Sequence, residues 1–213
     1  MDDLPRPDLA LAHRLFRQLH TDSADGDGVT WDAYGAGEQH AHDVIAAEGA
    51  RLGLDRHVDH AGNLLLTLPG RDRAARRLLI GSHLDSVARG GDYDGSVGVL
   101  AGLACPAGMV GAAYRPECDV ALIVIRAEEA GAWFAVSFPG SRAALGTLEP
   151  DALSVPRRDT GRPLGQHIAR QGLRRNGFAS ARAGLAQTPW RRSWKCISSR
   201  GRCWTGWVSR SGS

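Results

Sequence analysis

Two short apolar segments, with a helix between them, constrain the fold of this chain most strongly. Residues 76–82 (RRLLIGS) and 119–125 (DVALIVI) have the composition of buried strands, and residues 97–107 have that of a helix. A glycine-rich loop at 88–95 precedes the helix. Strand, helix and strand in this order form a βαβ unit, whose parallel strands need helices on both faces. The sequence therefore predicts an α/β fold with a mainly parallel sheet flanked by helices.

The residues before this unit supply further elements. Apolar residues recur at helical spacing over 8–20 and again over 38–53, which predicts two amphipathic helices. Two short strands are predicted at 55–59 and 63–68, joined by a turn that contains glycine and asparagine. On these predicted helices, the histidines are expected at the surface because their neighbours are mostly polar: His13, His20, His40 and His42.

Histidine and carboxylate residues follow the two strands of the βαβ unit. His83 comes directly after the first strand, Asp94 lies in the glycine-rich loop, and Glu128 and Glu129 follow the second strand. Ligands of parallel sheets gather at the carboxyl ends of strands, and imidazole with carboxylates suits a divalent metal ion. Asp85 is placed to accept the second imidazole N–H of the histidine. Carboxylates in polar loops are more often solvated or cap helices, so spacing alone leaves that alternative open.

Longer segments around these residues resemble a known family. They are GSHLDSVARGGDYDGSVGVLAGL (81–103), RAEEAGAWF (126–134) and FPGSRAALG (138–146). These segments resemble zinc-peptidase-like amidohydrolases of the N-carbamoyl-L-amino-acid hydrolase and allantoate amidohydrolase branch, also called hydantoinase/carbamoylase. HVDHAGNLLLTLPG (57–70) is similar to the hairpin that precedes the first ligand in that family. The resemblance extends over about residues 8–175, and the GGxYDG loop favours the amidase branch over the related carboxypeptidases.

The resemblance implies a role for each residue of the predicted site. His83 would bind one metal ion, Asp94 would bridge two, Glu129 would bind the other, and Glu128 would be the general base. The two divalent ions are usually zinc in this family, with manganese, cobalt or nickel as alternatives. The implied reaction is hydrolysis of a linear C–N bond in an N-carbamoyl amino acid or in a ureide such as allantoate, and a related aminoacylase or peptidase is an alternative. One departure from the family pattern is Ala130, directly after the two glutamates.

Charge and tryptophan are distributed unevenly along the chain. Residues 1–156 hold 13 arginines and 22 aspartates and glutamates, whereas residues 157–213 hold 13 basic residues and one acid, so net charges of −9 and +12 combine to +3. Four of the six tryptophans fall in the last 24 residues. Basic residues interleaved with aromatic ones are typical of segments that bind single-stranded nucleic acid. This segment has no apolar periodicity that would place the aromatic rings on one face, so nucleic-acid binding is the less favoured interpretation.

A shift of the reading frame accounts better for this basic segment. Members of the family continue with a segment such as LEVHIEQGP, whose histidine completes one metal shell, whereas this chain has PWRRSWKCISSRGRCWTGWVS at 189–209. Reading GC-rich codons one base earlier yields LAAFLEVHIEQGPVLDGLGV. We therefore predict a frameshift between about Phe178 and Gln187, a partial catalytic domain over 1–180 and a non-native, disordered tail over 181–213. On this prediction the dimerising lid domain of the intact family is absent, and the chain is an inactive fragment.

Further features predict the compartment and partners. No apolar run approaches the roughly 20 residues of a membrane helix, and the acidic start MDDLPRPD resembles no secretion signal. The four cysteines show no CxxC spacing, which favours a reducing compartment: Cys105, Cys118, Cys196 and Cys203. The sequence therefore predicts a cytoplasmic protein that acts on a small molecule without a membrane partner, with a homodimer in the intact family.

Overall fold

The computed structural model describes residues 4–173 and two short strands at 196–197 and 203–204. A six-stranded sheet has the order β3-β4-β6-β5-β7-β8. Its strands are β3 (Asp55–Val58), β4 (Leu64–Leu68), β5 (Leu78–His83), β6 (Val120–Ile125), β7 (Cys196–Ile197) and β8 (Cys203–Trp204). The helices are α1 (Leu9–Ser23), α2 (Ala36–Arg51), α3 (Ser96–Gly111), α4 (Pro139–Leu145) and α5 (Leu164–Arg170), with a 3-10 turn η1 (Pro150–Ser154). Strands β1 (Ala24–Asp25) and β2 (Gly28–Val29) pair separately.

The sheet is mixed, so the prediction of a mainly parallel sheet is wrong. β5 and β6 are parallel, as predicted for the βαβ unit, because α3 carries the chain back between them. β3 and β4 are antiparallel, since five residues join them and so short a connection permits only a hairpin. β4 is also antiparallel to β6, so the hairpin adds an antiparallel edge to the parallel pair.

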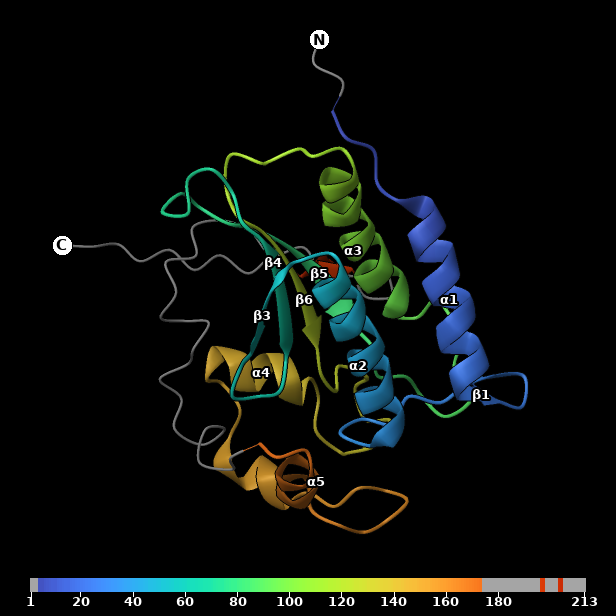
Figure 1. The fold of residues 1–213 in the computed structure, drawn as a ribbon. Coiled ribbons are helices and arrows are strands. Elements are labelled where there is room, and N and C mark those ends of the chain that lie inside the picture. The colour runs from blue at the N-terminus through green and yellow to red at the C-terminus, as the bar shows by residue number, and fades with distance from the viewer. Residues whose placement is uncertain (1–3, 174–195, 198–202, 205–213) are drawn as a thin grey trace, which may run out of the picture.

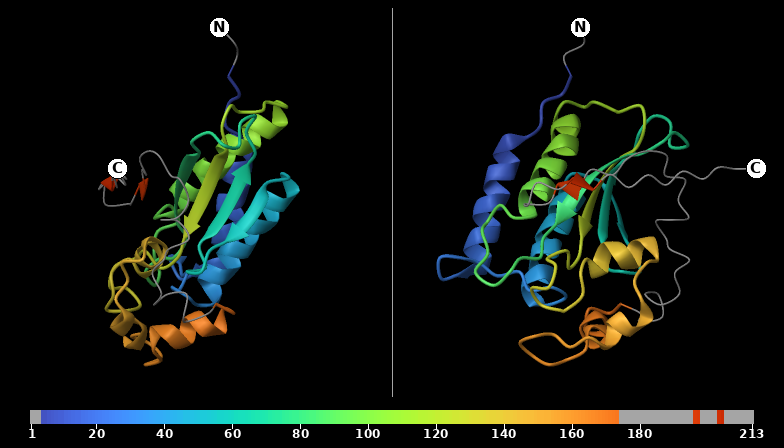
Figure 2. Two further views of the ribbon diagram at one scale, coloured as in Figure 1. Left: turned by 90° about the vertical axis from the view of Figure 1, so that its left-hand side faces the viewer. Right: turned by 180° about the vertical axis from the view of Figure 1, so that it is seen from behind.

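Helices cover both faces of the sheet, as predicted (Figure 1 and Figure 2). Leu122 and Val124 of β6 pack in the core cluster that includes side chains of α1, α2 and α3. Ile123 and Ile125 pack on the opposite face together with Ala144 of α4. Successive side chains of a strand point to opposite faces, so an uninterrupted apolar segment serves a strand that is buried on both sides.

One predicted surface residue of α2 is buried. His13, His20 and His40 are exposed as predicted, whereas His42 is only 3% exposed. The prediction for His42 is wrong because the inward stripe of α2 includes polar residues at helical spacing. The buried residues of this helix are Glu38, Ala41, His42, Ile45, Glu48 and Gly49.

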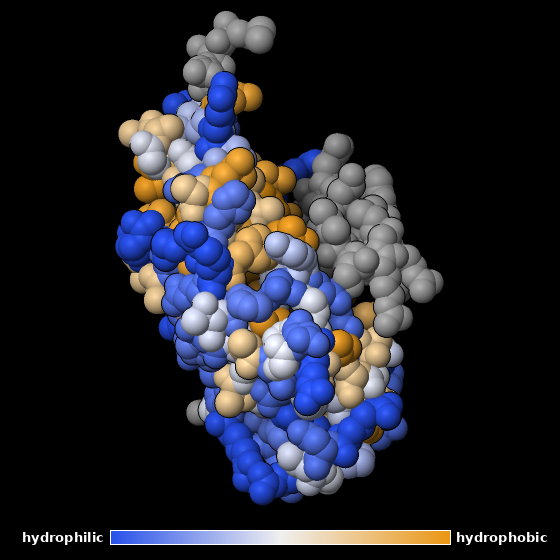
Figure 3. Space-filling view, turned by 90° about the vertical axis from the view of Figure 1, so that its right-hand side faces the viewer, coloured by the Kyte–Doolittle hydropathy of each residue, from blue (hydrophilic) through white to orange (hydrophobic). Residues whose placement is uncertain are grey.

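The face of the molecule that carries α1 differs in hydropathy between its two halves. Figure 3 shows hydrophobic residues gathered in the upper half of this face and hydrophilic ones over the lower half. Among exposed apolar side chains, Leu9 is the first residue of α1 and Leu4 lies in the segment before it. No described helix is both long enough and apolar enough to span a bilayer.

The predicted disordered tail over 181–213 lies mostly outside the described residues. Within it the structure describes only the two-residue strands β7 and β8, and β7 pairs in parallel with β5. The predicted boundary near residue 180 and the predicted absence of a lid domain therefore stay predictions.

Candidate metal centre

The predicted site residues lie where β5 and β6 end side by side. His83 is the last residue of β5 and pairs in register with Ile125, the last residue of β6. The loop after β5 carries Asp85 and leads through Asp94 into α3. The loop after β6 begins beside it, so residues more than 40 positions apart in sequence meet at one edge of the sheet.

Three residues can offer ligand atoms to one metal ion. One side-chain nitrogen or oxygen from each of His83, Asp94 and Glu129 lies within 4.8 Å of the others. Nε2 of His83 is 3.9 Å from Oε1 of Glu129. Oδ1 of Asp94 is buried and has no hydrogen-bond partner among the described residues. A buried carboxylate oxygen without a partner is costly, so this donor set fits a divalent cation of the zinc type.

Asp85 orients the imidazole of His83. Nδ1 of the imidazole lies 3.0 Å from the backbone oxygen of Asp85 and 3.1 Å from its Oδ1. Both contacts hold a proton on Nδ1 and leave Nε2 for the cluster. Burial lowers the pKa of His83, but the hydrogen bond and charge of Asp85, with the charges of Glu128 and Glu129, raise it to about 9. A cation that binds here therefore replaces a proton.

Asp85 has a second role that the sequence did not reveal. Its carboxylate is fully buried and accepts the backbone N–H of Glu128 at 2.8 Å and that of Glu129 at 2.9 Å. One side chain thus joins the loop after β5 to the loop after β6. No spacing in the sequence indicates this contact, because the residues are 43 and 44 positions apart.

Glu128 lies beside the cluster but is held by other groups. Its carboxylate accepts hydrogen bonds from the backbone N–H of Ser141 at 3.0 Å and from the Ser141 hydroxyl at 2.9 Å. Burial raises the pKa of Glu128 to about 8. The charge of Asp85 adds to this rise in pKa, and the hydrogen bonds from Ser141 oppose it. A pKa close to neutrality suits a group that first takes and then returns a proton. Ser141 lies in the FPGSRAALG segment but was not singled out from the sequence.

Glycine is needed where the loop between β5 and α3 passes His83. Gly95 has a φ of +67°, and a Cβ built on it would lie 2.5 Å from Cε1 of the His83 ring. Only a residue without a side chain lets Asp94 approach the histidine this closely in this conformation. In the loop after β6, Ala130, the departure from the family pattern, is exposed, and the next residue, Gly131, has a left-handed φ of +75°.

Comparisons with known proteins match this part of the chain. The family model described as Peptidase family M28 matches residues 63–152. An N-carbamoyl-L-amino acid amidohydrolase of Geobacillus stearothermophilus is 38% identical over 143 residues, which cover 67% of this chain and 35% of that protein. The chain is related to the hydantoinase/carbamoylase amidohydrolases. This confirms the family resemblance that the sequence motifs indicated.

Further relatives support the same relationship. An allantoate amidohydrolase of Bacillus subtilis is 30% identical over 159 residues, covering 75% of this chain and 38% of that protein. The crystal structure of a hydantoinase/carbamoylase family amidase from Burkholderia ambifaria superposes with a TM-score of 0.74 and 32% identity, covering 81% of this chain and 42% of that one. The chain thus spans less than half the length of each of these amidohydrolase relatives.

Proposed function

We propose that residues 4–173 contain the metal-binding and general-base residues of an enzyme that hydrolyses the linear C–N bond of an N-carbamoyl amino acid. The observation that carries this proposal is the convergence of His83, Asp94 and Glu129 beside a half-buried glutamate, Glu128. Allantoate is the second candidate substrate, because relatives of this chain include proteins named for each activity.

The proposed cofactor is a pair of divalent cations. Asp94 would be shared between the two ions, His83 would bind one, and Glu129 would bind the other. Zinc fits this donor set, with manganese, cobalt and nickel as the alternatives. When bound, such ions polarise a carbonyl oxygen and make water acidic enough to act as a nucleophile near neutral pH.

Glu128 would move the proton of the reaction. Its carboxylate would take a proton from the attacking water as the water oxygen adds to the substrate carbonyl carbon. As the C–N bond breaks, the same carboxyl would return the proton to the leaving nitrogen. Ser141 would hold the carboxylate in place during both transfers, since it contacts both carboxylate oxygens.

We further propose that the sequence after about residue 180 is out of frame and that the chain of 213 residues has negligible activity. The homodimer and the cytoplasmic location belong to the intact enzyme and stay predictions. Nucleic-acid binding by the basic segment is the less favoured alternative. The coding DNA tests the frame directly: if no shifted open frame there continues with an LEVHIEQGP-like segment, this part of the proposal fails.

The activity is tested with the frame-restored protein. We expect it to release an amino acid from an N-carbamoyl amino acid, or to hydrolyse allantoate, when zinc, manganese or cobalt is supplied. Glu128→Gln is expected to abolish turnover while leaving metal binding intact. Absence of turnover on both substrates with every metal would contradict the proposed reaction, and turnover by the chain of 213 residues would contradict its inactivity.

A further inference from the structure

Four consecutive backbone N–H groups after β6 donate to side-chain oxygens. The pairs are Arg126 with Oδ1 of Asn63 (2.9 Å), Ala127 with Oε1 of Glu38 (2.8 Å), Glu128 with Oδ1 of Asp85 (2.8 Å) and Glu129 with Oδ2 of Asp85 (2.9 Å). Backbone groups in strands normally pair with a neighbouring strand, but this turn begins where β6 ends. Its shape therefore depends on three side chains rather than on the sheet.

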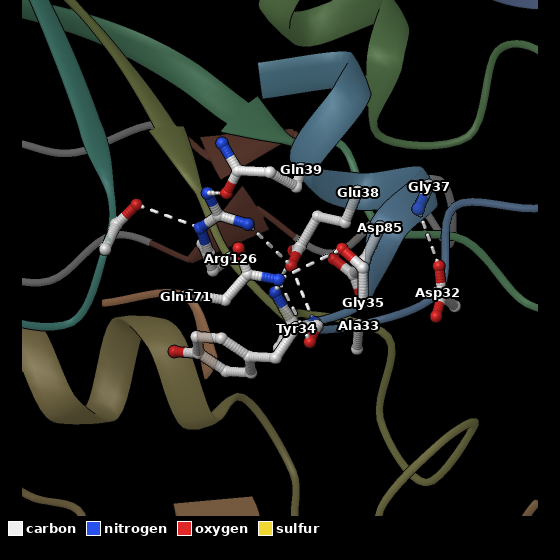
Figure 4. A network of polar contacts seen from close by, with 12 residues as sticks. Asp32, Ala33, Tyr34, Gly35, Gly37, Glu38, Gln39, Asp85, Arg126 and Gln171 are labelled. Carbon is white, nitrogen blue, oxygen red and sulfur yellow. Dashed lines mark hydrogen bonds and ion pairs between the residues drawn. The ribbon is translucent and has the colours of Figure 1, made fainter. Parts of the chain in front are cut away.

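Of the three residues that accept these hydrogen bonds, Glu38 is the farthest in sequence from the candidate metal ligands. It lies in the first turn of α2 and is completely buried. Its second oxygen, Oε2, accepts the backbone N–H of Tyr34 at 2.7 Å and lies 3.2 Å from Nη1 of Arg126. Figure 4 shows this carboxylate at the centre of the network, between the start of α2 and the end of β6. Neither the predicted ligands nor the predicted base includes this residue.

Arg126 ties the same turn to α2. Its guanidinium is buried and donates to the backbone oxygen of Gly62 at 3.0 Å and to Oε1 of Gln39 at 2.6 Å. Together with the contact to Glu38, these bonds give the arginine partners on both α2 and the β3–β4 turn. The charge of Glu38 is thereby balanced inside the protein.

Ala127 adopts a conformation that needs such support. Its φ is +53°, in the left-handed region that residues with a Cβ disfavour. A residue persists there when its surroundings hold it in place. Glu38 accepts the N–H of this very residue, and the next two residues are the proposed base, Glu128, and the proposed ligand, Glu129.

We propose that Glu38 is a positioning residue for the metal centre, which fixes the left-handed turn at Ala127 and so sets where Glu128 and Glu129 lie. This inference rests on the proposed function, because it assumes that Glu129 binds metal. Glu38 touches neither substrate nor metal in this role. It acts through the backbone of the turn and through Arg126.

The test measures Co²⁺ binding to the full chain of 213 residues by titration calorimetry and by the visible absorption of the bound ion. Glu38→Gln keeps the size of the side chain but loses the charge and one acceptor oxygen. We expect Co²⁺ affinity to fall about tenfold to a hundredfold, as for other residues that orient metal ligands, with an altered absorption spectrum. Glu48→Gln is the matched control, because Glu48 is buried on the same helix and pairs with Arg14 and Arg51 instead.

A rescue variant separates positioning from a general loss of stability. Adding Ala127→Gly to Glu38→Gln removes the penalty of the left-handed conformation. We expect this double variant to regain at least threefold in Co²⁺ affinity over Glu38→Gln alone. If Glu38→Gln does not fold, Gln39→Ala takes its place: this change loosens Arg126, and we expect about a threefold loss of affinity.

Each result then decides one point. If the unchanged chain does not bind Co²⁺, the proposed metal centre fails, and this inference fails with it. If the unchanged chain binds Co²⁺, the inference alone is overturned by any of three results. The first is wild-type Co²⁺ affinity and spectrum in folded Glu38→Gln, or in Gln39→Ala where that variant replaces it. The second is a loss of Co²⁺ affinity in Glu48→Gln equal to that in Glu38→Gln. The third is no gain of Co²⁺ affinity in the double variant over Glu38→Gln.

Discussion

Replacing Gly95 by alanine tests the packing of the loop between β5 and α3 against His83. Gly95 has a φ of +67°, and an added Cβ would lie 2.5 Å from Cε1, 2.6 Å from Nδ1 and 2.7 Å from Nε2 of the imidazole. The methyl group would therefore press on the ring of His83. Because the next residue back is Asp94, any adjustment of the backbone also moves a second proposed ligand.

Two other glycines allow the loss of folding free energy in Gly95→Ala to be divided between backbone conformation and the contact with His83. Gly53 has a φ of +71° with no atom within 4 Å of an added Cβ, so Gly53→Ala measures the conformational cost alone, about 1–2 kcal/mol. Gly91 lies in the same loop as Gly95, has open space around it and no left-handed φ, so Gly91→Ala should change stability by less than about 0.5 kcal/mol. Gly95→Ala should cost more than Gly53→Ala, since the contact with His83 adds to the conformational cost.

Thermal unfolding and Zn²⁺ titration measure the two consequences. For a chain of this length, each kcal/mol lowers Tm by about 2–4 °C, so Gly53→Ala should lower Tm by a few degrees and Gly95→Ala by more. Zn²⁺ affinity should fall about tenfold or more in Gly95→Ala and stay unchanged in the other two variants. The reasoning is refuted if Gly95→Ala unfolds at the same temperature as Gly53→Ala and binds Zn²⁺ as tightly as the unchanged chain.

Two further predictions concern pH. Burial lowers the pKa of His42, so below about pH 6.5 the unfolded chain binds a proton that the folded chain does not, and stability should fall by up to about 1.4 kcal/mol per pH unit. Urea unfolding between pH 7 and pH 5 should show a shallower loss in His42→Leu, and an unchanged slope would contradict this assignment. Ser141→Ala removes a hydrogen bond that lowers the pKa of Glu128, so in the frame-restored enzyme the acid limb of the pH–rate profile should move up by as much as about one pH unit. A profile that stays in place or moves to lower pH would exclude that role of the hydroxyl.

The βαβ unit could be predicted because its signals are local. Apolar strands, a glycine-rich loop and a helix stand in order along the chain, and the predicted helix over 97–107 falls within α3. The mixed character of the sheet could not be predicted in the same way. Antiparallel pairing of β4 with β6 depends on where the hairpin docks, and an apolar strand has the same composition beside either kind of neighbour.

The proposed metal ligands were predicted from residue type and family motif, whereas the groups that hold them were not. Glu38 accepts from Ala127, 89 positions away, and Ser141 donates to Glu128, 13 positions away. His42 was also missed: it is buried on α2 and has no hydrogen-bond partner among the described residues. Hydrophobic periodicity cannot distinguish a polar residue on the inward stripe of a helix from one at the surface. Asp85 was predicted only for its contact with His83, because that contact is local.

Zn²⁺ titration of the full chain and of Asp94→Asn tests the central claim most directly. Asp94→Asn removes the charge of the carboxylate whose Oδ1 is buried and has no hydrogen-bond partner in the described part of the chain. Asp92→Asn changes a half-buried neighbour in the same loop, which pairs with His20. The account predicts saturable binding to the unchanged chain, at least a tenfold loss in Asp94→Asn and no loss in Asp92→Asn. Absence of saturable binding, or equal affinity in Asp94→Asn and the unchanged chain, would contradict the proposal that these residues form a metal centre.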